Sequence, residues 1–219
     1  MIWESVQISL LVVTIATIVV AVVGLSFAYL LARYDFFGKE LLDALLTMPL
    51  VLPPTVTGYY LIVLLGRRGL LGSPIYDLTG WSFAFTWQGA VIAAVVVALP
   101  IMIKASRASI ESVGRNFEDA SYTLGKGRLE TFFRITLPLA KRGVIAGIVL
   151  SSARALGEFG ATLMLAGNIP GKTQTMPLAI YEAVSTGADI RASLLAVILT
   201  VVSVTAVYLT NKMTRARIY

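Results

Sequence analysis

The chain has 219 residues, of which 57% are hydrophobic and only 14% are charged, and its formal net charge is +6. A soluble domain of this size would have too little polar surface to cover its core, so lipid must cover the rest. The sequence contains no cysteine and no histidine, which removes thiolate chemistry, the usual near-neutral proton shuttle and the commonest metal ligand. We therefore expect neither a catalytic site nor a metal site in this chain.

Long apolar stretches dominate the sequence. Asp, Glu, Lys and Arg are absent from 5–32, 44–66, 78–103 and 192–211, and the stretch 143–171 contains only Arg154 and Glu158. About 20 predominantly apolar residues cross a hydrocarbon core as a helix. The first stretch differs from a secretory signal in having no basic segment before it and in its greater length, so we expect a retained helix. The sequence predicts an all-α membrane protein with five transmembrane helices.

The basic residues are distributed unevenly between the two faces that five spans would create. Thirteen fall on the face that holds the first connector, the third connector and the C-terminus, including Arg215 and Arg217, and four fall on the other face. The positive-inside rule places the richer face in the cytoplasm and the N-terminus outside. Because topology accounts for this charge, we expect no nucleic-acid partner.

Two adjacent prolines interrupt the second apolar stretch. Pro53 and Pro54 remove backbone donors and should break the helix in mid-membrane. Such breaks often line a transport path, although a kink can also serve packing alone. Thr55 and Thr57 beside them can offer hydroxyls to an anion or bond to their own backbone. These four residues are candidates for a translocation path.

The connector 104–142 has helical features of its own. Asn116 is placed to cap a short helix, Phe117, Ala120 and Leu124 follow at helical spacing, and Gly125 stands where that helix should stop. A second short helix, with Leu129, Phe132 and Phe133 on one face, should end before Pro138. Two short helices around a glycine predict either a protrusion with an apolar side or helices that lie on the membrane surface.

The fourth apolar stretch carries the two charges that lie within a predicted span. Arg154 and Glu158 are four residues apart and should share a helix face. Each charge costs about 2.5 to 3.5 kcal/mol near the bilayer centre, so neither should face lipid. They either form a salt bridge that stabilises packing, or Arg154 guides an anion along the path while Glu158 keeps it from binding too tightly.

A glycine, lysine and threonine at 171–173 superficially suggest a phosphate-binding loop. The preceding Gly167 is separated from Gly171 by three residues where that motif needs four, and an apolar span precedes it where the motif has a strand. The motif fails, so we expect no cofactor on this chain.

The connector 104–142 also carries a spaced motif. It consists of Asp119, Ala120 and Ser121, then Gly125 after three residues, Ile135 after nine more, and finally Leu137 and Pro138. It resembles the EAA loop of ABC importer permeases, with Asp and Ser where that family usually has Glu and Ala. The resemblance implies that the loop docks on a separate ATPase subunit, which binds ATP and Mg²⁺. The residues so implicated are Asn116, Phe117, Asp119, Ala120, Ser121, Leu124, Gly125, Ile135, Leu137 and Pro138.

A wider resemblance covers nearly the whole chain. The segments 41–60, 66–72, 83–90, 155–162 and 168–181 are similar to those of molybdate ABC transporter permeases, and tungstate and sulfate permeases share looser versions. The resemblance implies a bacterial or archaeal plasma-membrane permease for a tetrahedral oxyanion, which an external binding protein delivers.

We therefore predict one permease domain over 1–219 that contains a cytoplasmic coupling loop at 104–142. One five-helix bundle is too small to enclose an alternating pathway, so a second copy should complete it. The expected partners are that copy, the ATPase subunits, the binding protein and membrane lipid. The alternative from another class is an uncoupled anion channel or a membrane anchor, which has no need of a structured coupling loop.

Overall fold

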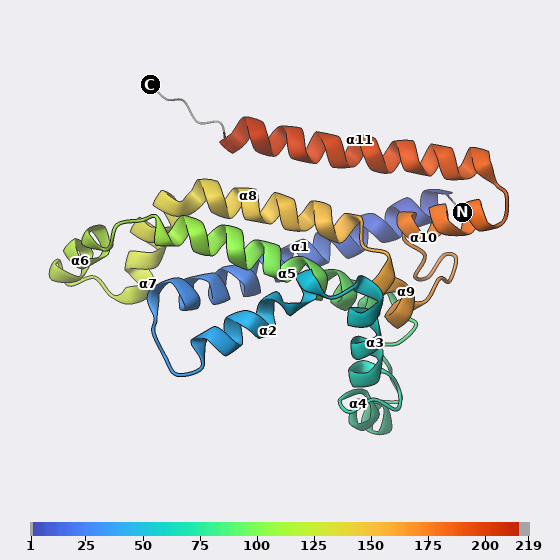
Figure 1. Cartoon of the computed structure of the whole chain (residues 1–219), viewed down its shortest axis with the longest axis horizontal. Helices are drawn as coiled ribbons and strands as arrows, with labels where there is room; N and C mark the ends of the chain where they lie inside the picture. The colour runs from blue at the N-terminus through green and yellow to red at the C-terminus, as the bar shows by residue number, and fades with distance from the viewer. Residues whose placement is uncertain (1, 215–219) are drawn as a thin grey trace.

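Long helices lie side by side along the molecule, and shorter helices gather at their two ends (Figure 1). The computed structural model describes residues 2–214, without some side chains after residue 205, and these residues form helices and loops but no strand. Arg215 and Arg217 lie outside the described residues. The helices are α1 (Ile2–Arg33), α2 (Lys39–Val51), α3 (Pro54–Leu65), α4 (Gly72–Thr79), α5 (Trp87–Glu111), α6 (Arg115–Thr123), α7 (Arg128–Thr131), the π-helical η1 (Phe132–Thr136), α8 (Leu137–Leu156), α9 (Gly160–Ala166), α10 (Met176–Ser185) and α11 (Asp189–Thr214).

The all-α prediction is confirmed, and several predicted spans are recovered as helices. Three helical runs are long and apolar enough to cross a membrane: α1, α5 and the continuous run 128–156. The bent pair α2 and α3 is a further candidate span, and α11 covers the fifth predicted stretch with 26 helical residues. The count of five spans and their orientation stay predictions.

Small buried residues bring the central helices together. α1 buries Val12, Ala16, Val20, Gly24 and Ala28, one residue in every four, against α5. Small side chains at such spacing allow membrane helices to approach closely. At Gly24 a Cβ atom would lie 2.6 Å from Met102 Cγ on α5, so a larger residue would push the helices apart. α5 also packs on α8 and is thereby central to the bundle.

The predicted break at Pro53 and Pro54 is confirmed. Leu52 and Pro53 are extended, with ψ of 141° and 137°, which is the conformation that a following proline favours. α3 restarts with Pro54 in its first turn, where a missing N–H costs least, and its axis is bent by 118° from that of α2. In Figure 1, α3 therefore leaves the bundle sideways and leads to α4.

The fourth predicted stretch is not one helix. α8 ends at Leu156, a short link follows, and α9 begins at Gly160. Glu158 lies in this link, so the prediction that Arg154 and Glu158 share a helix face is wrong. Gly157, which forms the C-cap of α8, weakens helical continuation at this point, and the periodicity of the apolar residues does not reveal that break.

The second connector helix does not end before Pro138, contrary to the prediction. Helical structure continues from Arg128 to Leu156, and Pro138 lies in the first turn of α8. The π-helical residues of η1 precede it and change the hydrogen-bond register. Proline, which has no N–H to donate, is accommodated inside this continuous run by the shifted register of the π-helical residues before it. The helix α6, which precedes this run in the chain, lies at one end of the bundle, opposite the N-terminus (Figure 1).

Candidate functional site

Two glycines, Gly114 and Gly125, flank the short helix α6. Its N-cap is Gly114, with no side-chain hydrogen bond, so the prediction of an Asn116 cap is wrong. Asn116 instead folds back over Gly114, where a Cβ atom would lie 2.4 Å from Asn116 Oδ1. This contact favours glycine at position 114 and starts the helix earlier than the side-chain types indicate.

The predicted stop at Gly125 is confirmed. Gly125 has a φ of +78°, in the left-handed region that glycine adopts at little cost. Its N–H donates to Tyr122 O at 2.9 Å, and the N–H of Lys126 donates to Ser121 O at 3.1 Å. These two bonds form a Schellman motif, which ends the helix and redirects the chain toward α7.

The outward side of α6 is apolar and accessible. Phe117 is 53% exposed and Leu124 is 79% exposed, and Ala120 between them is also exposed. With Ile135 they border a recess of about 350 Å³, whose other lining residues are Ser121, Lys126, Glu130 and Arg134. An exposed apolar surface with a charged rim is typical of a protein interaction site. The docking surface, defined as Phe117, Ala120, Leu124 and Ile135, therefore combines residues from α6 and η1.

The inward side of α6 is polar. Its buried residues are Glu118 and Ser121. Ser121 Oγ lies 2.9 Å from Thr131 Oγ1 of α7. Glu118 Oε1 accepts hydrogen bonds from Arg33 Nε at 3.0 Å and from Thr136 Oγ1 at 2.5 Å. Asp119, the acidic residue that the motif singled out, is exposed, so Glu118 is the acid that attaches α6 to the bundle.

Sequence reasoning missed Glu118 and Arg33 for different reasons. Glu118 is one residue away from the motif position, although its helical spacing from Ser121 places both on one face of α6. Arg33 lies in the first connector, where the sequence assigns it only to the basic charge that sets topology. The two residues are 85 positions apart, and no local pattern in the sequence pairs them.

The predicted break at Pro53 and Pro54 lies against the break between α8 and α9, which the sequence did not predict. At Gly58 a Cβ atom would approach Ala161 Cα to 2.8 Å, and at Gly160 it would approach Pro54 Cβ to 3.0 Å. α3 and α9 therefore cross at van der Waals contact, which only small residues allow. Thr57 is buried, and its Oγ1 has no hydrogen-bond partner among the described residues, whereas Thr55 is exposed.

Arg154 and Glu158 form the predicted ion pair beside this crossing, with Arg154 Nη1 2.8 Å from Glu158 Oε2. Glu158 Oε1 accepts the N–H of Ala161 at 2.8 Å and so caps α9. The Glu158 side chain is 1% exposed, but that of Arg154 is 30% exposed. The Glu158 Oε2 contact lacks the alignment of a hydrogen bond. The guanidinium group is thus held at one side and open at the other.

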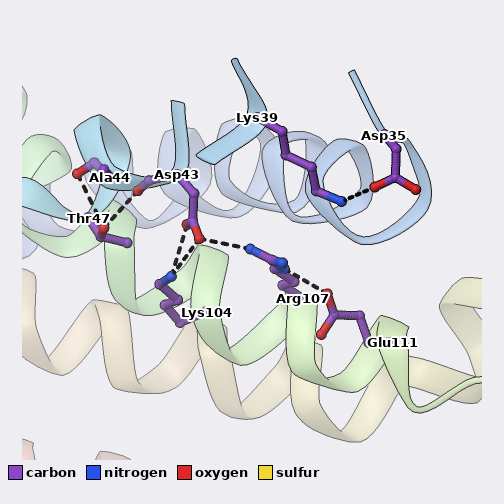
Figure 2. Close-up of polar contacts among 8 residues, drawn as sticks. All are labelled: Asp35, Lys39, Asp43, Ala44, Thr47, Lys104, Arg107 and Glu111. Atoms are coloured by element: carbon purple, nitrogen blue, oxygen red, sulfur yellow. Dashed lines mark hydrogen bonds and ion pairs between the residues drawn. The ribbon is translucent and has the colours of Figure 1, made fainter. Parts of the chain in front are cut away.

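Ion pairs also attach the arm formed by α2 to the bundle. Asp43 contacts Lys104 Nζ at 2.9 Å and Arg107 Nη1 at 2.9 Å on α5 (Figure 2). α2 buries none of its residues, so these polar contacts rather than apolar packing hold its first half in place. Asp35 pairs with Lys39 in the preceding loop (Figure 2), and that hydrogen bond lowers the pKa of the Asp35 carboxyl.

The segment at 171–173 does not form a phosphate-binding loop. Thr173 is fully buried, and its Oγ1 accepts the N–H of Ile169 at 3.1 Å within the same loop. Its hydroxyl is therefore committed to the loop that joins α9 to α10.

These features define a helical membrane protein that carries a short helix with an exposed apolar side at one end of its bundle. A family described as "Binding-protein-dependent transport system inner membrane component" matches residues 21–218, and this chain belongs to that family. Its members are components of transport systems, so the chain is a transport subunit rather than an enzyme.

Named proteins with similar sequences include permeases of molybdenum and sulfate transport systems. The chain is 50% identical over 184 residues to "Molybdenum transport system permease protein ModB" of Escherichia coli (strain K12), covering 84% of this chain and 80% of that protein. It is 48% identical to the protein of that name from Haemophilus influenzae over 80% of this chain and 79% of the relative. The identity to "Sulfate transport system permease protein CysW" of Synechococcus elongatus is 38% over 82% of this chain and 63% of the relative.

Solved structures share the fold at low sequence identity. A bacterial ABC transporter for import of the acidic polysaccharide alginate aligns with a TM-score of 0.75 and 14% identity, covering 97% of this chain and 78% of that chain. An inward-facing MetNI methionine ABC transporter aligns with a TM-score of 0.69 and 14% identity, covering 99% and 94%. The architecture is therefore that of an ABC importer permease.

Proposed function

We propose that this chain is the permease subunit that carries molybdate across a bacterial or archaeal plasma membrane. The observation that carries the proposal is the 50% identity to a molybdenum permease over 84% of the chain. The lower identity of 38% to a sulfate permease ranks sulfate second, and tungstate shares the tetrahedral shape and charge of molybdate. The alternative of an uncoupled channel or membrane anchor leaves the docking surface without a purpose.

The path in this proposal runs past the crossing of α3 and α9, where the two helix breaks meet. Arg154 offers the open side of its guanidinium group to a dianion, and Glu158 fixes the other side. A guanidinium group carries five N–H donors in a planar fork that suits oxyanions. The contact of α3 with α9 places four further residues beside this crossing: Pro53, Pro54, Thr55 and Thr57. A second copy of the chain would complete the pathway.

ATP hydrolysis occurs in a separate subunit in this proposal. The docking surface would enter a groove of that ATPase, which holds ATP and Mg²⁺, and an external binding protein would deliver molybdate at the opposite end. Closure of the ATPase would then move α6 and change the access of the path. Asp119, Ser121, Leu137 and Pro138 belong to the coupling region at the base of the docking surface.

The substrate is tested with the chain reconstituted into vesicles with the ATPase and binding protein of the same transport system. We expect uptake of radioactive molybdate that requires ATP and the binding protein. Sulfate in tenfold excess should compete weakly, and tungstate should compete well. Equal uptake of sulfate would reassign the substrate, and ATP-independent uptake would favour a channel.

The docking surface is tested by Ala120→Trp, because an indole ring at its centre would clash with a well-packed groove. We expect the variant to reach the membrane in normal amounts but to lose copurification with the ATPase. Ser112→Trp is the matched control, since Ser112 is exposed near α6 but outside the recess. Wild-type ATPase binding by Ala120→Trp would contradict the docking role.

A further inference from the structure

We propose that Arg33, Glu118 and Thr136 form a junction that transmits the movement of α6 to the membrane helices and so sets how much transport each ATP hydrolysis yields. The inference rests on the proposed function, because it assigns to these residues the step between ATPase docking and the path. They are positioning residues, since none of them lies on the docking surface or at Arg154.

The first step of the argument is the number of elements that meet at the junction. Glu118 belongs to α6, Thr136 to η1 and Arg33 to the last turn of α1. Arg33 Nη2 also donates to Ile110 O and Val113 O, both at 3.0 Å, at the end of α5. One guanidinium group therefore connects the docking helix to α1 and α5, and Glu118 connects it to the helical run that continues into α8.

The second step is burial. The side chains of Arg33 and Glu118 are 8% and 6% exposed, and Thr136 is fully buried. A buried ion pair contributes little net stability, because desolvation offsets the attraction, but loss of one partner leaves an uncompensated charge. Such a pair resists separation while fixing the positions of its partners. Displacement of α6 is thus favoured only if the elements bonded to Glu118 move with it.

The third step is that α6 has no apolar anchor. Its buried residues are the polar Glu118 and Ser121, while Phe117, Ala120 and Leu124 face outward. Ser121 bonds to Thr131 in the neighbouring short helix α7, so that contact does not reach α1 or α5. Among the described residues of α6, Glu118 forms the ion pair with α1, and Tyr122 adds a side-chain hydrogen bond to Tyr29 of the same helix. The ion pair of Glu118 is the charged and buried part of this connection, and through Arg33 it also reaches α5.

The fourth step is geometric specificity. Arg33 uses Nε for the carboxylate and Nη2 for the two carbonyl groups. A lysine has one ammonium group on a flexible stem and cannot hold both sets of acceptors in fixed directions. Arg33→Lys therefore keeps the charge but should loosen the connection, which separates the positioning role from charge alone.

The main experiment compares Glu118→Gln, Arg33→Lys and Thr136→Val in the reconstituted complete transporter. We expect all three to bind the ATPase and to hydrolyse ATP, but the molybdate transported per ATP should fall. A decrease of at least about fivefold is expected for Glu118→Gln and Arg33→Lys, the lower end of typical coupling between sites. Thr136→Val keeps the ion pair and should show a smaller decrease. Asp35→Asn, in an exposed pair outside the junction, is the control.

An unchanged ratio of transport to hydrolysis in Glu118→Gln and Arg33→Lys would overturn the proposal, as would loss of ATPase binding in parallel with transport. A second measurement needs no substrate. Because the native sequence has no cysteine, spin labels can be placed on Thr123→Cys and Arg142→Cys, both at exposed positions of the isolated permease.

The distance between these labels should be narrowly distributed in the otherwise native chain and broad with Glu118→Gln or Thr136→Val. Unchanged distributions would overturn the junction even if the variants fold poorly in the complete complex. If the unmodified transporter moves no molybdate, the proposed substrate fails, and the label distances still decide whether the junction fixes α6.

Discussion

Two of the arginine–glutamate pairs among the described residues involve a buried carboxylate, and they differ in what remains free. In the pair of Arg33 with Glu118, both side chains are buried, and the guanidinium group also bonds to two carbonyl groups. In the pair of Arg154 with Glu158, the carboxylate is buried but the guanidinium group is 30% exposed. We call the first pair closed, because both of its side chains are buried, and the second pair open, because its arginine side chain is partly exposed.

The difference follows from the elements that surround each pair. Arg33 lies at the end of α1, where the carbonyl groups of Ile110 and Val113 at the C-terminus of α5 accept its donors. Arg154 lies near the end of α8, where the chain breaks and Glu158 turns to cap α9. A closed pair suits force transmission, and an open pair suits transient anion contact. The same two residue types therefore serve different proposed roles because their neighbours differ.

The largest expected effect is the loss of stability on opening the closed pair. Arg33→Ala leaves Glu118 buried without a cation, which typically costs about 3–5 kcal/mol. We expect much less folded protein in the membrane and a lower thermal unfolding midpoint in detergent. The double variant Arg33→Met/Glu118→Leu should recover stability but not transport. If Arg33→Ala unfolds at the wild-type temperature, the junction is not as closed as its contacts indicate.

The next effect concerns transport through the open pair. Arg154→Gln removes the charge-assisted donors and should fold, yet its molybdate uptake should fall about tenfold or more, since hydrogen bonds to charged groups contribute about 1.5–3 kcal/mol. Initial uptake rates at equal amounts of assembled transporter provide the measurement. Arg154→Lys, which keeps the charge, should retain more activity. Normal uptake by well-folded Arg154→Gln would make this pair structural and remove the contrast between the two.

The contrast also explains how far the sequence could predict the structure. Local features were predictable: the break at Pro53 and Pro54 and the stop at Gly125 depend on backbone properties of the residues themselves. The apolar spacing of Phe117, Ala120 and Leu124 likewise predicted an exposed face. The ABC permease fold followed from the resemblance, which the family match confirms.

Features that depend on distant partners or on competing local choices were not predictable. The pairing of Arg33 with Glu118 requires the fold to bring α1 beside α6. The start of α6 at Gly114 and the continuation through Pro138 arise from close contacts and from a π turn that residue propensities do not encode. Glu158 was placed on a helix because apolar periodicity continued across the break at Gly157.

A smaller effect is expected for the carboxylate of the open pair. Glu158→Gln keeps an oxygen that can accept the Ala161 N–H but removes the charge that holds Arg154. The freed guanidinium group should retain molybdate longer, so that half-saturation occurs at lower concentration while the maximal uptake rate falls severalfold. Initial uptake rates over a range of molybdate-loaded binding protein separate the two parameters. A lower maximal uptake rate together with half-saturation at a higher concentration would contradict a restraining role for Glu158.

The smallest effect should come from an ion pair that is neither closed nor within the bundle. Asp35 contacts Lys39 Nζ at 2.7 Å, but its side chain is 85% exposed. The hydrogen bond from Lys39 lowers the pKa of Asp35, so any stabilisation is present above the ordinary carboxyl pKa and is lost as pH falls through the lowered value. Water and salt screen such a pair, so Asp35→Asn should leave the thermal unfolding midpoint and the uptake rate unchanged at neutral pH. A decrease comparable to that of Arg33→Ala would mean that short contact distance, rather than burial and additional hydrogen bonds, decides how much an ion pair matters in this chain. The distinction between closed and open pairs would then lose its physical basis.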